Sequence, residues 1–266
     1  MADRSERMTF PGSHGAALAG RLDLPQGPPV AYALFAHCFT CSKEIFAASR
    51  ISAALSERGI AVLRFDFTGL GSSEGEFANT NFSSNVGDLV RAADHLRQRF
   101  EAPKILVGHS LGGTAGLIAA GRIPESVALA TINSPYDPAH VRHLLKESVP
   151  AIEAAGEAEV VIGGGTFRIQ RQFLEDVDAQ NMRQAIGGLR KALLVFHAAQ
   201  DELVAIDNAR LIFEAAHHPK SFISLDDADH LLTRREDAVY VGAVLAAWAS
   251  RYIGRLTGDE ARATKA

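Results

Sequence analysis

Cysteine is scarce in this sequence, with only Cys38 and Cys41 among 266 residues. A single pair excludes the multi-disulfide framework that holds small secreted domains together. A structural zinc site is also excluded, because it needs four ligands and no second C-x-x-C motif is present. We therefore interpret the two cysteines as reduced thiols in a loop, and we expect no bound metal.

Long apolar runs and clusters of one charge are also missing. No stretch reaches the roughly 18 apolar residues that a membrane span needs. The charged N-terminal residues lack the apolar core of a signal peptide. The net charge is −4, with no cluster of Lys and Arg, so a nucleic-acid partner is not expected. These absences predict a cytoplasmic protein without a membrane span.

What the sequence does contain is an alternation of short apolar runs with longer helical segments. A chain of 266 residues that is 47% hydrophobic suits one large α/β domain. The alternation predicts a mostly parallel sheet with helices on both faces, preceded by an antiparallel hairpin over 8–10 and 16–23. The later strands are expected at 31–36, 61–66, 104–107, 127–132, 192–197 and 221–225, and the main helices at 46–58, 81–100, 111–120 and 238–252.

One region interrupts the alternation. It contains a helical piece over 140–155, a hairpin of 159–162 and 166–170 around three glycines, and a helix near 172–183. A structureless loop of this length would be unusual in a compact domain, so we interpret the region as an inserted lid. The predicted division is a core over 1–133 and 189–257, a lid over 134–188 and a polar tail over 258–266.

The motif G-x-S-x-G occurs twice, centred on Ser73 and on Ser110. Its glycines permit a sharp strand-to-helix turn that presents the serine hydroxyl at a helix N-terminus. Ser110 follows a predicted strand and precedes a predicted helix, whereas Ser73 lies in a Gly/Ser-rich stretch with neither. The context predicts Ser110 as a nucleophile and Ser73 as a surface-loop serine.

A serine nucleophile needs a base, and the base needs an acid that orients it. Asp201 follows the strand 192–197, and His230 follows the strand 221–225. The chain order of serine, acid and histidine is the order expected for this kind of site. We predict Asp201 as the acid and His230 as the base, with Asp137 and Glu202 left as alternative acids.

The other histidines fit this role less well. We expect His217 and His218 at the surface. His140 and His143 have a spacing that could bind a metal, but no third ligand is apparent. His109, inside the motif, is expected to pack or hydrogen-bond locally.

In this order the motifs resemble the α/β-hydrolase superfamily over nearly the whole chain. More narrowly, the sequence is similar to bacterial hydrolases fused to a C-terminal OsmC-like domain. That likeness is carried by HCFTCSK (37–43), RFDFTGLG (64–71), NFSSNV (81–86), KSF (220–222) and DDADHLL (226–232). It implies an eight-stranded sheet with an inserted lid, carboxylesterase-type activity on short acyl esters, and an OsmC-like thiol peroxidase domain in a longer parent chain.

The loop after the strand 31–36 is expected to supply part of the oxyanion hole. We predict the backbone N–H groups of Phe39 and Leu111 as the two donors. Cys38 stands where many members of the superfamily have glycine, and His37 is expected to anchor the loop. Because OsmC-like domains perform thiol redox chemistry, we hypothesise that oxidation of the two cysteines distorts this loop and stops hydrolysis.

The predicted activity is hydrolysis of a small-molecule ester through an acyl-enzyme, without a cofactor. A thioesterase or a small-peptide hydrolase is the nearest alternative. A non-catalytic interaction module on the same scaffold is the alternative from another class. Dehalogenase and epoxide-hydrolase chemistry is disfavoured, because it needs Asp in place of Ser110. The sequence leaves homo-oligomerisation open.

Overall fold

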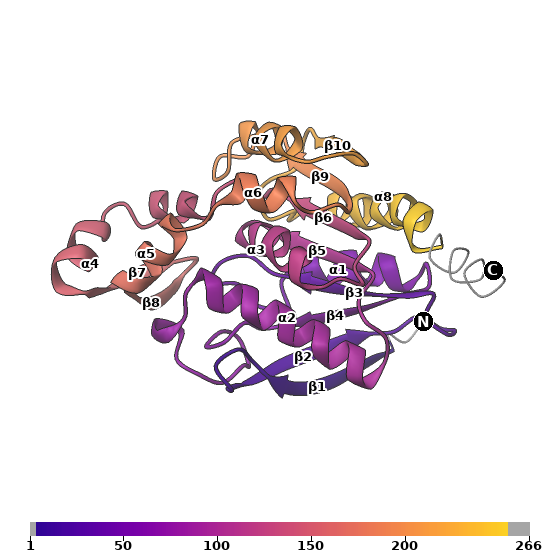
Figure 1. The fold of residues 1–266 in the computed structure, drawn as a ribbon, viewed down its shortest axis with the longest axis horizontal. Coiled ribbons are helices and arrows are strands. Elements are labelled where there is room, and N and C mark those ends of the chain that lie inside the picture. The colour runs from indigo at the N-terminus through magenta and orange to yellow at the C-terminus, as the bar shows by residue number, and fades with distance from the viewer. Residues whose placement is uncertain (1–3, 255–266) are drawn as a thin grey trace.

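A single eight-stranded sheet forms the centre of the molecule (Figure 1). The computed structural model describes residues 4–254, so the predicted polar tail lies outside the described residues. The strand order is β1-β2-β4-β3-β5-β6-β9-β10, and the six strands from β4 to β10 run parallel. The strands are β1 (Ser5–Pro11), β2 (Ala17–Asp23), β3 (Ala31–Ala36), β4 (Ile60–Phe65), β5 (Ile105–His109), β6 (Ala128–Ile132), β9 (Ala192–Ala198) and β10 (Lys220–Leu225).

Helices cover both faces of this sheet. Helices α1 (Phe46–Ser56) and α8 (Arg235–Ile253) pack into the core on one face. Helices α2 (Phe82–Arg99), α3 (Leu111–Ala119) and α7 (Asp207–Ala215) pack into the core on the other. Successive side chains of a strand point to opposite faces, and a buried parallel sheet is apolar on both. The predicted mostly parallel sheet with helices on both faces is confirmed.

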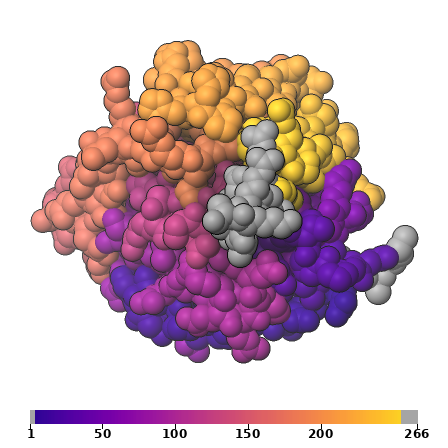
Figure 2. Space-filling view, turned by 45° about the vertical axis from the view of Figure 1, so that its right-hand side comes forward, coloured from indigo at the N-terminus to yellow at the C-terminus, as the bar shows by residue number. Residues whose placement is uncertain are grey.

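The two halves of the chain form one body. In Figure 2 the N-terminal half, indigo to magenta, packs directly against the later segments, orange to yellow. The predicted N-terminal hairpin is present as β1 and β2, and β2 pairs antiparallel with β4. Among residues 4–254, no helix has the length and hydropathy that a membrane span requires.

The segment between β6 and β9 holds a small two-stranded sheet and several short helices, and it projects beside the main sheet (Figure 1). The predicted hairpin is present. The predicted helix 140–155 is instead two pieces, because Pro150 is tolerated in the first turn of a helix and not in its interior. The predicted helix 172–183 is also split, and Asn181 caps the second piece. The elements are the 3-10 helix η3 (Pro138–His143), α4 (Val149–Ala155), β7 (Glu157–Ile162), β8 (Gly165–Gln170), α5 (Arg171–Asp178) and α6 (Met182–Gly187).

Two short 3-10 turns, η1 (Phe77–Asn79) and η2 (Ala120–Arg122), lie outside this segment. Because β5, β6, β9 and β10 are parallel, their carboxyl ends meet at one edge of the sheet. The segments that follow β5, β9 and β10 carry Ser110, Asp201 and His230.

Candidate active site

Ser110 forms the turn between β5 and α3. Its backbone has φ 54° and ψ −130°, a strained conformation for a residue with a side chain. Its N–H donates to the carbonyl of Ile132 on the neighbouring strand, 2.8 Å away. The strained turn leaves the hydroxyl at the N-terminus of α3.

The glycines of the motif are needed for close packing around this turn. A Cβ on Gly108 would lie 2.4 Å from Cα of Gly113, and a Cβ on Gly112 would lie 2.2 Å from the carbonyl oxygen of His37. Such distances are far below van der Waals contact. The two glycines therefore let α3 approach both its own strand and the loop after β3.

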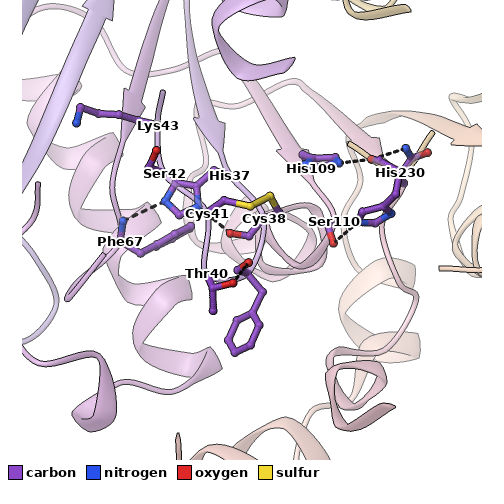
Figure 3. Close-up of a disulfide and its surroundings, with 12 residues drawn as sticks. His37, Cys38, Thr40, Cys41, Ser42, Lys43, Phe67, His109, Ser110 and His230 are labelled. Atoms are coloured by element: carbon purple, nitrogen blue, oxygen red, sulfur yellow. Dashed lines mark hydrogen bonds between the residues drawn. A yellow bond between two sulfur atoms is a disulfide. The ribbon is translucent and has the colours of Figure 1, made fainter. Parts of the chain in front are cut away.

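The structure brings Ser110, Asp201 and His230 together from three separate loops. Nε2 of His230 lies 3.1 Å from Oγ of Ser110, and Nδ1 lies 2.7 Å from Oδ2 of Asp201. An ionised carboxylate only accepts hydrogen bonds, so Nδ1 carries the proton. That tautomer leaves the lone pair of Nε2 facing the serine hydroxyl (Figure 3).

Asp201 is held as an anion. Its side chain is fully buried, and its second oxygen accepts from the N–H groups of Leu203 and Val204, both 2.9 Å away. Burial acts to raise the pKa of this carboxyl, but the hydrogen bonds from His230 and from the backbone outweigh it. The net result is a pKa below the ordinary value.

One predicted oxyanion donor, the N–H of Leu111, directly follows Ser110 in the chain, and the other, the N–H of Phe39, belongs to the loop that α3 approaches at Gly112. The N–H of Leu111 belongs to the first turn of α3, where helical N–H groups have no partner within the helix. Neither this N–H nor that of Phe39 has an acceptor among residues 4–254. Both groups are therefore free to bind an anion.

The cysteines differ from the expectation, because Cys38 and Cys41 form a disulfide (Figure 3). The prediction of two reduced thiols is wrong. The N–H of Cys41 donates to the carbonyl of Cys38, which closes a turn, and Thr40 has φ +59° inside it. This turn brings the two Cα atoms to 5.3 Å, within the range that a disulfide bridges. Phe39 therefore lies in a covalently closed turn.

His37 anchors this turn through two hydrogen bonds, as predicted. Its Nε2 accepts from the N–H of Phe67, and its Nδ1–H donates to the carbonyl of Cys38, 2.8 Å away. Burial lowers the pKa of His37 to about 4, so the ring is neutral near pH 7. The far end of the loop is fixed by Lys43, whose Nζ lies 2.7 Å from Oδ2 of the fully buried Asp66.

The alternative residues have other roles. The carboxylate of Asp137 caps η3 by accepting from the N–H of Ala139. The hydroxyl of Ser73 donates to the carbonyl of Asp66 and accepts from the N–H of Ala19, so it braces a loop. Three other candidates are exposed, namely Glu202, His217 and His218.

The predicted metal-compatible pair gains no third ligand. The rings of His140 and His143 contact each other with centroids 4.9 Å apart. Within the described residues, no group of three potential ligands could hold a metal ion.

Two residues make contacts that sequence patterns did not reveal. His109 does not bond locally, because its Nε2 lies 2.7 Å from the carbonyl oxygen of His230, 121 residues away. Asn133, directly after β6, also donates to that carbonyl. Its position at the same sheet edge as Ser110 is the only sequence signal that could have singled it out.

A small, partly open cavity of about 10 Å³, room for about one water molecule, is lined by Phe39 and Leu111, which carry the two predicted oxyanion donors. Phe39, Leu70, Leu111 and Ala115 give it apolar walls. Asn85 of α2 also lines it, and the side-chain amide of Asn85 has no partner among the described residues. The cavity is therefore small and mostly apolar, with His37, Thr40 and Asn85 as its polar lining residues.

Several known proteins are similar to this chain in sequence or in structure. An esterase domain from a Rhodothermus marinus protein is 52% identical, with a TM-score of 0.79, over 94% of this chain and 100% of that chain. The uncharacterized protein YfhR of Salmonella typhimurium is 24% identical over 85% of this chain and 75% of its own length. The mitochondrial palmitoyl-protein thioesterase ABHD10 of Mus musculus is 28% identical, and the match spans 67% of this chain and 62% of that protein. The profile of the alpha/beta hydrolase family matches residues 33–256, and the chain belongs to that family.

Proposed function

We propose that the protein is a serine hydrolase that cleaves carboxylic esters through an acyl-enzyme on Ser110. The observation that carries the proposal is the continuous hydrogen-bonded series from Ser110 through His230 to Asp201. A serine hydroxyl is a weak nucleophile, and this arrangement supplies the base and the acid that it needs.

Acylation begins when Oγ of Ser110 attacks the ester carbonyl. Nε2 of His230, 3.1 Å from Oγ, takes the hydroxyl proton as the C–O bond forms. The resulting imidazolium is stabilised by the carboxylate of Asp201. The negative charge that develops on the carbonyl oxygen is bound by the N–H groups of Phe39 and Leu111, and each such donor is worth about 3 kcal/mol in the transition state.

Collapse of the tetrahedral intermediate breaks the ester C–O bond, and His230 gives its proton to the departing alcohol. A water molecule then attacks the acyl-enzyme. His230 takes one proton from that water and returns it to Ser110 when the acid product leaves. The cycle needs no group beyond these side chains and two backbone amides.

Two observations support an ester of a short acid as the substrate. The relative from Rhodothermus marinus, at 52% identity over its whole length, is an esterase domain. The cavity beside the N–H groups of Phe39 and Leu111 is small, about 10 Å³, with Leu70 and Ala115 in its wall, so a small acyl group fits it better than a long chain.

The runner-up is a thioesterase, because a curated relative at 28% identity is a palmitoyl-protein thioesterase and the triad chemistry also acts on thioesters. A panel of p-nitrophenyl acetate, butyrate, octanoate and palmitate, together with an S-palmitoyl peptide, separates the two. We expect the highest kcat/KM on the acetate or butyrate ester. A preference for the S-palmitoyl peptide would assign the thioesterase instead.

A further inference from the structure

The backbone carbonyl of His230 accepts hydrogen bonds from two buried side chains. Nε2 of His109 lies 2.7 Å from this oxygen, and Nδ2 of Asn133 lies 2.9 Å from it. A carbonyl oxygen has two lone pairs, so both donors can bond at once. The two donors stand at the carboxyl ends of the neighbouring strands β5 and β6.

Asn133 joins the three loops that carry the proposed triad. Its Oδ1 accepts from the N–H of Ala198, three residues before Asp201, at 2.8 Å. Its Nδ2 also lies 3.2 Å from the carbonyl oxygen of Asp229. The residue immediately before it, Ile132, accepts the N–H of Ser110. Asn133 therefore touches the acid and histidine loops and adjoins the serine loop.

This arrangement requires an asparagine in several respects. Asn133 is fully buried and has φ +48°, a conformation that Asn tolerates better than most residues with a side chain. The position uses both halves of the amide, one as acceptor and one as donor. Aspartate would keep the acceptor and lose the donor.

His109 has one hydrogen-bonding role. Burial lowers its pKa to about 4, so the ring is neutral near pH 7. Its Nδ1 has no partner, and the carbonyl opposite Nε2 can only accept. The proton of the neutral ring therefore sits on Nε2, where it donates to His230.

We propose that Asn133 and His109 are positioning residues that set the direction of the His230 imidazole through the carbonyl of the same residue. Asp201 holds one end of the ring at Nδ1, while these two donors fix the backbone from which the ring projects. Together they keep Nε2 directed at the hydroxyl of Ser110. The inference rests on the proposed function, because its consequence is the rate of proton transfer to His230.

The first test replaces His109 in two ways and uses the same ester for all variants. His109→Leu removes the donor and keeps an apolar side chain, whereas His109→Gln offers an amide N–H that can reach the place of Nε2. We expect kcat of His109→Leu to fall about tenfold or more with KM nearly unchanged, because small misplacements of a catalytic group cost rate. We expect His109→Gln to return to within about threefold of the parent.

The second test is Asn133→Asp, with Thr131→Val as its matched control. Thr131 is also buried on β6, and its hydroxyl has no hydrogen-bond partner, so Val replaces it without loss of a contact. We expect Asn133→Asp to lower kcat about tenfold or more and Thr131→Val to leave it unchanged, because only the former removes a donor to His230. The downfield proton resonance of the His230–Asp201 hydrogen bond should broaden in Asn133→Asp and stay sharp in the control.

The outcomes separate this inference from the proposed function. Parent-like kcat in both His109→Leu and Asn133→Asp, in a parent that hydrolyses the ester, overturns the positioning role and leaves the hydrolase intact. An equal loss of kcat in His109→Leu and His109→Gln also overturns it, because the lost donor would not be the cause. If His109→Leu does not fold, Asn133→Asp and its resonance decide the question. A parent that neither turns over the ester nor reacts with a fluorophosphonate overturns both proposals.

Discussion

Nδ1 of His230 lies 2.7 Å from Oδ2 of Asp201, although the two residues are 29 positions apart in the chain. The parallel pairing of β9 with β10 creates this proximity, because both residues follow the carboxyl ends of those strands. The contact selects the histidine tautomer in which Nε2 can accept a proton from Ser110.

Replacing Asp201 with Asn should remove this selection. The amide would no longer stabilise the imidazolium, and it could hold the ring in the wrong tautomer, so kcat should fall by roughly 10³- to 10⁴-fold with a small change in KM. Steady-state hydrolysis of p-nitrophenyl acetate measures the change. Asp137→Asn is the control, because Asp137 caps η3, and its kcat should stay within about threefold of the parent. A larger loss of kcat in Asp137→Asn than in Asp201→Asn would instead identify Asp137 as the acid that orients the histidine.

Gly112→Ala should separate α3 from the loop that carries Phe39. The new methyl group would lie 2.2 Å from the carbonyl oxygen of His37, so the backbone must move. We expect a lower melting temperature and at least about a tenfold loss of kcat. In Gly116→Ala, on the same helix, the nearest atom is 3.5 Å away, and both properties should stay near those of the parent. Equal behaviour of the two variants would argue against the tight approach of helix and loop.

Reduction of the disulfide discriminates between two views of the turn at Phe39. The bonded turn leaves the N–H of Phe39 without an acceptor, so reduction should loosen a formed oxyanion site and lower kcat. The hypothesis that oxidation stops hydrolysis predicts the opposite. Ester turnover before and after dithiothreitol, with thiols counted, measures the direction, and a double variant with Cys38→Ser and Cys41→Ser should be insensitive to the reagent. A rise in the rate of the parent on reduction would favour the oxidation hypothesis.

Acid should destabilise the fold through its buried histidines. His37 and His109 have pKa values of about 4 in the folded protein, against an ordinary value of 6.5. Between pH 6.5 and pH 4 the unfolded chain therefore binds protons that the folded protein does not, and the free energy of unfolding falls as the pH falls. Urea denaturation at several pH values across this range measures how steeply the free energy of unfolding depends on pH. We expect this pH dependence to be smaller in His109→Gln than in the parent, by up to about one bound proton. Identical slopes for the variant and the parent would contradict the low pKa of His109.

Much of the framework follows from local patterns in the sequence. Buried parallel strands are short apolar runs, so the sheet could be located without knowledge of its contacts. The chain order and the strand-end positions singled out Ser110, Asp201 and His230, because parallel strands place their carboxyl ends together. Helix ends were predicted less accurately. The helix predicted over 140–155 does not run through Pro150, which stands instead in the first turn of α4.

The contacts that could not be predicted depend on the folded backbone. The disulfide requires the turn conformation at Thr40, which a C-x-x-C spacing does not specify. The bonds from His109 and Asn133 to the carbonyl of His230 span 121 and 97 residues. Every residue has a backbone carbonyl, so residue type does not indicate which carbonyl accepts a side-chain hydrogen bond. Only the structure reveals such a partner.

We propose that Ser110, and not Ser73, is the nucleophile. Labelling with a fluorophosphonate tests it most directly, because the reagent forms a covalent bond only with an activated serine. We expect the parent and Ser73→Ala to label, and we expect Ser110→Ala, verified as folded by its melting temperature, to remain unlabelled. Labelling of Ser110→Ala at the rate of the parent would show that another residue is the nucleophile.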